Sequence, residues 1–171
     1  MRKVEVVAFQ SKWHTLFEEE AERLRGVLKN EIVEIHHIGS TSVHGLKAKP
    51  IIDMMPVVHD LSRIDAYNDL MQKLGYEPKG ENGLAGRRYF QKGGHHRTHH
   101  VHIYEKGSPE INRHLAFRDY LRSHPDEREV YGDLKEKLAR EFPYDIDSYI
   151  NGKDEVVKEI ERKALAWYKN W

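Results

Sequence analysis

The stretch that most constrains the fold is an apolar run, Ile51 to Val58, which contains one charged residue, Asp53. A run of this length and composition is typical of a strand that is covered on both faces. An unpaired carboxylate there would cost several kcal/mol, so Asp53 needs a metal ion, a cation or several hydrogen-bond donors. Asp53 is therefore the first candidate for a functional residue.

A loop rich in glycine and hydroxyl groups precedes this strand. Residues 31–38 alternate and are rich in branched side chains, which predicts a strand that ends at Gly39. The loop continues as Ser40, Thr41 and Ser42, whose backbone and hydroxyl groups can donate to phosphate oxygens. The plainer interpretation is a connecting loop, since these residue types are ordinary in loops. Beside an inward acid, such a loop suits a phosphate chain near a metal ion.

Residues 87–91 and 99–104 are predicted to form a β-hairpin, because both have strand composition and they flank the glycine pair at 93–94. Histidines are concentrated in this region. His95 and His96 lie next to the glycine turn, so we expect them to be exposed.

His100 and His102 are two residues apart on the second predicted strand, so they project from one face. With Asp53 they form a candidate metal site and catalytic centre. Two imidazoles and a carboxylate suit zinc, manganese, iron or nickel better than magnesium, and the identity of the divalent ion stays open. In the alternative, both histidines are half-buried and hydrogen-bonded to backbone or to Asp53. A histidine-triad hydrolase is disfavoured because Thr98 and Tyr104 occupy the possible third positions.

Helices are predicted on both sides of these strands. The N-terminal helix, Trp13 to Leu28, has an apolar stripe, and its glutamates are expected to face water. Residues 61–74 predict a second helix that covers the sheet and ends at Gly75. The predicted packing residues include Leu16, Leu70 and Val130, and the expected exposed acids are Glu18, Glu19, Glu20 and Glu22. Strands mixed with helices in this order predict an α/β or α+β fold with a mixed sheet.

The C-terminal third is predicted to be helical. Ser108-Pro109 starts a helix to about His124, Pro125 starts another through Phe142, and a last helix follows Gly152. Arg118 in the first of these is a secondary candidate for phosphate binding, with a structural ion pair as the favoured alternative. Lys153 would sit at a helix start, where the helix dipole does not favour a cation. We therefore consider Lys153 for phosphate binding, against a simple exposed lysine.

The motif from Gly39 to Asp53, GSTSVHGLKAKPIID, resembles the GrpB family, which belongs to the nucleotidyltransferase fold. Similar segments follow in the family's order at residues 97–102, 114–125 and 149–153. The resemblance implies a nucleotidyltransferase-like sheet with C-terminal helices. It also implies a nucleotide or other phosphorylated ligand held near Asp53. Met55 departs from the parent fold, because catalytic transferases carry a second metal-bridging carboxylate at that position.

Three functions remain open. The leading one is a nucleotidyltransferase-like protein, in which the loop and Lys49 hold phosphates and Asp53 with His100 and His102 holds one divalent ion. A second is a non-catalytic binding module that has lost the second acid. A third is a single-metal phosphohydrolase.

Composition limits the other possibilities. The chain of 171 residues suits a single domain spanning residues 1–171, and 28 basic and 28 acidic residues give a net charge of zero. No overall positive field favours nucleic acid as a partner. No cysteine is present, and neither a signal peptide nor a membrane-spanning run is visible, so we expect a cytoplasmic protein with no membrane partner.

Overall fold

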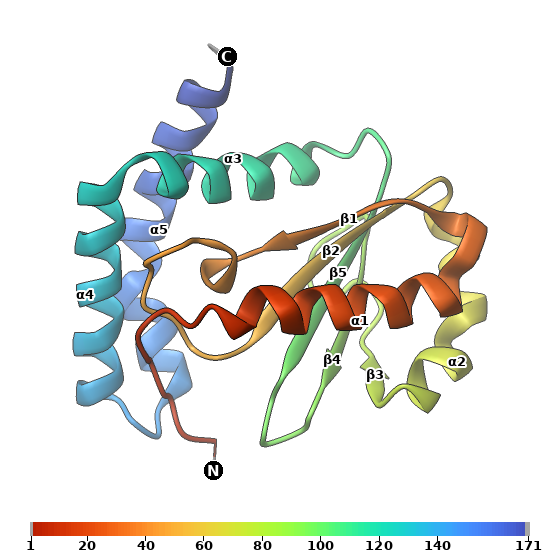
Figure 1. The fold of residues 1–171 in the computed structure, drawn as a ribbon, viewed down its shortest axis with the longest axis horizontal. Coiled ribbons are helices and arrows are strands. Elements are labelled where there is room, and N and C mark those ends of the chain that lie inside the picture. Colours follow the sequence, from red (N-terminus) through yellow and green to blue (C-terminus); the bar gives the residue numbers. More distant parts are fainter. Residues whose placement is uncertain (1, 170–171) are drawn as a thin grey trace.

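The computed structural model describes residues 2–169 as a five-stranded mixed sheet with helices on both faces (Figure 1). The strand order is β1-β2-β5-β4-β3. β2 and β5 are parallel, and the remaining neighbours are antiparallel. The strands are β1 Ile32–Ile38, β2 Ile52–Val58, β3 Tyr76–Pro78, β4 Arg87–Lys92 and β5 His99–Glu105. The predicted α+β class, the mixed sheet and the β4–β5 hairpin are confirmed.

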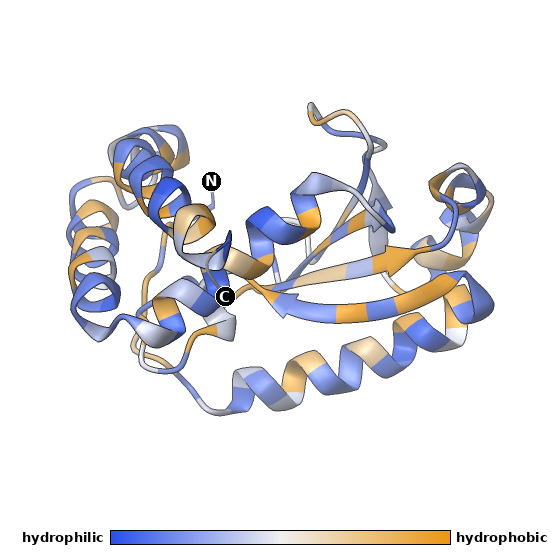
Figure 2. Ribbon diagram, turned by 90° about the horizontal axis from the view of Figure 1, so that it is seen from above, coloured by the Kyte–Doolittle hydropathy of each residue, from blue (hydrophilic) through white to orange (hydrophobic). Residues whose placement is uncertain are grey.

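Alternation along β2 sends neighbouring side chains to opposite faces of the sheet. On one face, Met54 packs in the main core beneath α1 (Lys12–Leu28), whose buried stripe includes Trp13 and Leu24. On the other face, Met55 packs against residues of α3 (Pro109–Ser123). Figure 2 shows the sheet from above, with α1 along one side of it. Asp53 shares the α3 face with Met55.

The C-terminal helices form a second core at one end of the sheet. α3 is followed by α4 (Pro125–Glu141) and α5 (Ile146–Lys169). Their buried side chains enclose Val43 and Leu46 from the loop after β1. The N-terminal segment ties this helical unit to the sheet, because Val4 N donates to Pro143 O over 2.8 Å and Val7 pairs with Ala48. The loop after β1 is therefore held between sheet and helices.

Two predicted helix boundaries are wrong. Residues 61–74 do not form one α-helix; they form a 3₁₀-helix, η3 Leu61–Tyr67, followed by the short α2, Asn68–Lys73. Ile64 and Tyr67 are three apart, a spacing that suits either kind of helix. The last helix begins at Ile146, well before Gly152, and Asp145 Oδ1 accepts from Ser148 N at its start. Gly152 instead lies where α5 crosses α4, since an added Cβ would lie 2.5 Å from Leu138 Cδ2.

Several predicted exposures are also wrong. Leu16, Leu70 and Val130 were expected to pack but are exposed. They lie at the edges of their apolar stripes, where helical spacing alone does not fix burial. Glu20 was expected to face water but is fully buried, because it accepts hydrogen bonds from Tyr76 and Lys92 on the neighbouring strands. Among residues 2–169, no helix has the length and apolar character needed to cross a bilayer.

Candidate functional site

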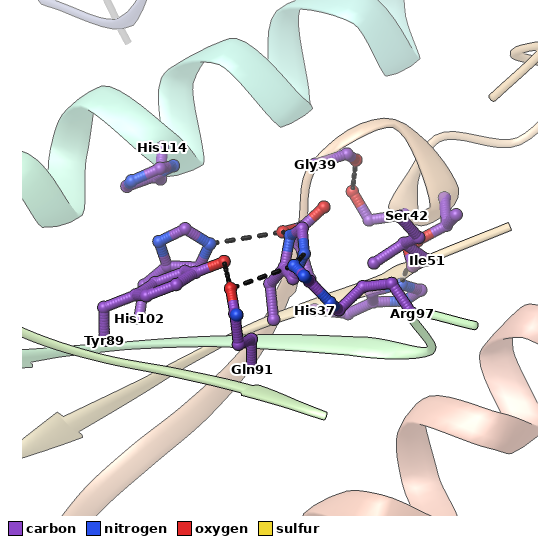
Figure 3. A network of polar contacts seen from close by, with 12 residues as sticks. His37, Gly39, Ser42, Ile51, Tyr89, Gln91, Arg97, His102 and His114 are labelled. Atoms are coloured by element: carbon purple, nitrogen blue, oxygen red, sulfur yellow. Dashed lines mark hydrogen bonds and ion pairs between the residues drawn. The ribbon is translucent and has the colours of Figure 1, made fainter. Parts of the chain in front are cut away.

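Asp53 lies near the start of β2, an inner strand of the sheet, together with both predicted histidine partners. It is aligned with His100 across the parallel β2–β5 pair. Asp53 Oδ1 lies 3.4 Å from His100 Nδ1 and 3.2 Å from His102 Nε2. Figure 3 marks the contact of His102 with a dashed line. Burial by itself would raise the pKa of Asp53, but the hydrogen bonds from the two imidazoles outweigh it and hold the pKa far below its usual range. The predicted three-residue cluster therefore forms around an ionised carboxylate.

Arg97 fixes the orientation of His100. Its Nη1 lies 3.1 Å from His100 Nε2 and donates to Gln91 Oε1 over 2.9 Å. Because a guanidinium only donates, His100 Nε2 accepts this hydrogen bond. The ring hydrogen of a neutral His100 is then on Nδ1, the nitrogen that faces Asp53. Figure 3 shows Gln91 joined by dashed lines to Tyr89 and to Arg97.

The arrangement of the cluster does not fit a metal centre. A His100 that bound an ion through Nδ1 would carry its ring hydrogen on Nε2, but Arg97, which can only donate, already contacts that nitrogen. Within residues 2–169, no group of three or more His, Cys, Asp or Glu side chains is placed to hold a metal ion. A guanidinium at this position also repels a cation. The predicted ligands are together, but as hydrogen-bond partners, which is the alternative left open for His100 and His102.

Gly39 brings the loop against Asp53. Its φ is +72°, and an added Cβ would lie 2.7 Å from Asp53 Oδ2, so both the backbone conformation and the space require glycine. The turn Ser40–Ser42 follows. Ser40 lines the cavity next to Asp53 and is partly exposed. Thr41 also touches the cavity but is buried, with Oγ1 donating to Ile51 O and lying 3.0 Å from His37 Nε2.

The other predicted residues are divided between the cavity and the protein interior. Ser42 is buried, and its hydroxyl donates to Gly39 O. Arg118 lies outside the cavity lining; it pairs with Asp119 over 2.8 Å and donates to His37 O. The favoured ion-pair interpretation of Arg118 is therefore the one found. Lys49 and Lys153 both line the cavity, although Lys153 lies about two turns inside α5 and not at its start.

Three lysines converge on this cavity, which has a volume of about 340 Å³ and lies between the loop, β2, β5 and the C-terminal helices. They are Lys49, Lys135 and Lys153. Lys49 Nζ and Lys153 Nζ lie 5.2 and 5.5 Å from the ring of Tyr149, and Lys135 Nζ lies 4.6 Å from the ring of Tyr131. None of the ion pairs within residues 2–169 includes any of the three lysines.

Burial and mutual repulsion act on these ammonium groups together. Burial, reinforced by the charges of Lys153 and Arg2, lowers the pKa of Lys49 to about 8. Burial also lowers the pKa of Lys135 well below its usual range, with Lys153 and Lys49 adding to the effect. Cations that share a poorly hydrated space are stabilised by a bound anion. Asp53 in the same lining partly opposes the shifts of Lys49 and Lys135, but the basic groups of the cavity outnumber this one acid, a pattern that suits an anion.

Lys135 is the main residue that the sequence prediction missed. Its side chain is only 2% exposed. The signal was present, because Lys135 is four residues after Tyr131 and three before Leu138, both of which are buried. Helical spacing therefore puts Lys135 on the buried face of α4. Arg97 was also missed, although it begins the segment that contains the two site histidines.

A smaller cavity of about 230 Å³ lies on the other side of Asp53, towards α3 and α5. Its lining includes the rings of His114, Phe117 and Tyr131. Ser40 and Lys153 line both this cavity and the lysine cavity. His102 Nδ1 is buried and, among the described residues, has no hydrogen-bond partner. Asp53 thus lines both the lysine cavity and this smaller cavity, called the aromatic cavity below, whose lining also includes Arg113 and Glu161.

The GrpB protein family matches residues 3–163. The chain belongs to the GrpB family. A conserved GrpB protein from Enterococcus faecalis of known crystal structure is 47% identical, with a TM-score of 0.93 over 96% of this chain and 99% of that one. The family resemblance noted in the sequence is confirmed.

Among curated relatives, the UPF0157 protein YqkA of Bacillus subtilis is 54% identical over 98% of this chain. The chain spans 49% of the length of that relative. A dephospho-CoA kinase of Mycolicibacterium paratuberculosis is 26% identical over 96% of this chain and 46% of its own length. The family thus includes chains about twice as long as the region matched here.

Comparison of folds gives the wider class. The Cid1 poly(U) polymerase, in a structure with bound MgGTP, superposes with a TM-score of 0.53 over 78% of this chain and 44% of its own, at 17% identity. At this identity the similarity concerns the fold. The chain has a nucleotidyltransferase-like fold, as predicted.

Proposed function

We propose that this protein binds a nucleotide or a similar phosphorylated small molecule, with the phosphates in the cavity lined by Lys49, Lys135 and Lys153. The observation that carries the proposal is the convergence of these three lysines without an ion-paired acid. Each charged hydrogen bond to a phosphate oxygen contributes about 1.5–3 kcal/mol. Ser40 and the backbone of the turn Ser40–Ser42 can supply neutral donors beside the lysines.

The aromatic cavity supplies a place for the nucleoside. Its lining of His114, Phe117 and Tyr131 offers ring faces for a base, and Ser40, Asp53 and Lys153 join it to the lysine cavity. The named nucleotide ligands of the Cid1 structure and the kinase name of the mycobacterial relative support a search among nucleotides and dephospho-CoA.

Transfer of a nucleotidyl group is the finer hypothesis, and the fold similarity to Cid1 favours it. Met55 opposes it. The side chain of Met55 is fully buried with Ile38 and Tyr104, so this position is packed as apolar core and supplies no second carboxylate. We therefore place binding first and transfer second, with release of inorganic phosphate as the third outcome of the same assay.

Lys135→Met tests the binding proposal. The affinity for a non-hydrolysable ATP analogue, measured by calorimetry, is expected to fall by about 10- to 100-fold, which corresponds to one charged contact. In ligand-free buffer the variant is expected to unfold at a higher temperature, because a polar amine that is costly to bury has been replaced by an apolar side chain of similar length. Lys137→Met, an exposed change two residues further along α4, is the control.

Equal binding by the Lys135→Met and Lys137→Met proteins would refute the proposal, as would absence of binding by the unmodified protein across ATP, UTP, GTP and dephospho-CoA. The same titrations with and without Mg²⁺, Mn²⁺ or Zn²⁺ test the divalent-ion prediction for Asp53, His100 and His102. Incubation with labelled triphosphates then separates transfer, which releases pyrophosphate, from hydrolysis and from binding alone.

A further inference from the structure

A basic groove lies next to the proposed nucleotide site. It has a volume of about 590 Å³ and is formed by the N-terminal segment, residues 49–51 just before β2, and the β4–β5 turn. Lys49 and Ile51 line both the groove and the lysine cavity, so the two spaces adjoin. The basic side chains of the groove are Arg2, Lys3, Lys49, His95, His96 and Arg97.

The charge of this groove is not balanced by its surroundings. Glu5 is the acidic residue in the lining. None of the ion pairs formed within residues 2–169 involves Arg2, Lys3 or Arg97. Arg97 is held by neutral acceptors instead, namely Gln91 Oε1, Gly94 O and His100 Nε2. Because the whole chain has a net charge of zero, this concentration of positive charge is local.

The groove is held in place by contacts at both ends of the N-terminal segment. Val4 is buried, and its N–H donates to Pro143 O. Val7 exchanges hydrogen bonds of 2.9 and 3.0 Å with Ala48. Arg2 is close enough to Arg97 for that charge to add to the effect of burial in lowering the pKa of Arg2. Two parts of the chain that are far apart in sequence thus present cations to one space.

We infer that this groove binds a second, phosphorylated small-molecule substrate beside the nucleotide. The inference rests on the proposed function. A nucleic-acid strand fits less well, because apart from His95 and His96 the lining has no ring on which bases could stack. Through Arg97, an anion in the groove contacts the side chain that orients His100 and hence reaches the Asp53 cluster. The groove and the nucleotide cavity would therefore be used together.

The test uses inorganic tripolyphosphate as the probe for the groove. The protein is first saturated with the non-hydrolysable ATP analogue, and tripolyphosphate is then titrated by calorimetry. We expect a second binding event that is weakened by about tenfold or more in the double variant Arg2→Glu, Lys3→Glu. The matched control is Lys73→Glu, Lys106→Glu, which changes net charge equally at exposed lysines outside both spaces.

The outcomes separate the two proposals. Binding of the ATP analogue that is lost in Lys135→Met but unchanged in Arg2→Glu, Lys3→Glu supports the nucleotide cavity. If tripolyphosphate then shows no second event, or equal weakening in the control, the groove inference fails while the proposed function stands. If the ATP analogue does not bind, tripolyphosphate is titrated into the ligand-free double variants. Weaker binding by Arg2→Glu, Lys3→Glu than by Lys73→Glu, Lys106→Glu then supports the groove, and equal binding refutes it. Tighter binding of a single-stranded oligonucleotide than of tripolyphosphate would overturn the small-molecule substrate.

Discussion

Gly39 shows how closely the site is built at the scale of one residue. Replacing it by alanine forces a side chain onto a backbone with φ of +72° and onto Asp53 Oδ2. We expect Gly39→Ala to destabilise the protein by about 1–3 kcal/mol and to lower nucleotide affinity by displacing the carboxylate. Urea denaturation and calorimetry measure the two effects. Gly83→Ala is the control that separates backbone strain from the clash with Asp53, because Gly83 has φ of +88° but open space around its added Cβ. Equal losses in the two variants would argue against a role for the Asp53 contact.

Residue patterns predicted the centre of the site but not its full lining. A lone acid in an apolar strand and two histidines at strand spacing were enough to place Asp53, His100 and His102 together. The partners of a histidine nitrogen cannot be predicted in this way, because Arg97 reaches His100 from a loop whose path is set by tertiary contacts. Lys135 was overlooked for a different reason: lysine on an apolar stripe is usually taken as an exposed residue at its edge.

At the scale of elements, the α4–α5 crossing depends on Gly152. Alanine is normally the better helix residue by about 1 kcal/mol, yet here its Cβ would lie 2.5 Å from Leu138 Cδ2. We expect Gly152→Ala to destabilise the protein and Leu138→Ala to relieve part of that cost in the double variant, as measured by urea denaturation. Additive effects of the α4 and α5 changes would contradict the proposed close crossing.

Gly26→Ala in α1, where nothing lies within 4 Å of the added Cβ, is expected to stabilise the protein by about 0.5–1 kcal/mol in the same measurement.

Strand boundaries were predicted better than helix boundaries for a physical reason. The strands of this sheet are delimited by glycine turns and by period-two alternation, both of which are local. The start of α5 is capped by Asp145, whose Oδ1 accepts a hydrogen bond from Ser148 N. This signal is local, but in the prediction Gly152 was given more weight as the start of the helix. The change from 3₁₀- to α-helix within residues 61–73 has no comparable local marker.

At the scale of the whole molecule, Glu20 makes the stability of the protein depend on pH in the acid range. Its carboxylate joins α1 to Tyr76 of β3 and Lys92 of β4. Burial opposes ionisation, but hydrogen bonds from Tyr76, Lys92 and Arg23 lower the pKa of Glu20 to about 2. Because the folded pKa is depressed, the stabilisation is complete above about pH 4.5 and is lost as the pH falls towards 2. Relative to Glu20→Gln, the unmodified protein is expected to lose up to about 3 kcal/mol of unfolding free energy in that window. Parallel pH curves from urea denaturation would contradict this.

The parallel pairing of β2 with β5 determines when the contact between Asp53 and His100 forms during folding. Asp53 and His100 face each other across strands separated by the whole of η3, α2, β3 and β4, so the chain must close a long loop before they meet. Such non-local pairing is slow to form during folding. A newly made chain thus acquires its carboxylate–imidazole centre only with the completed sheet.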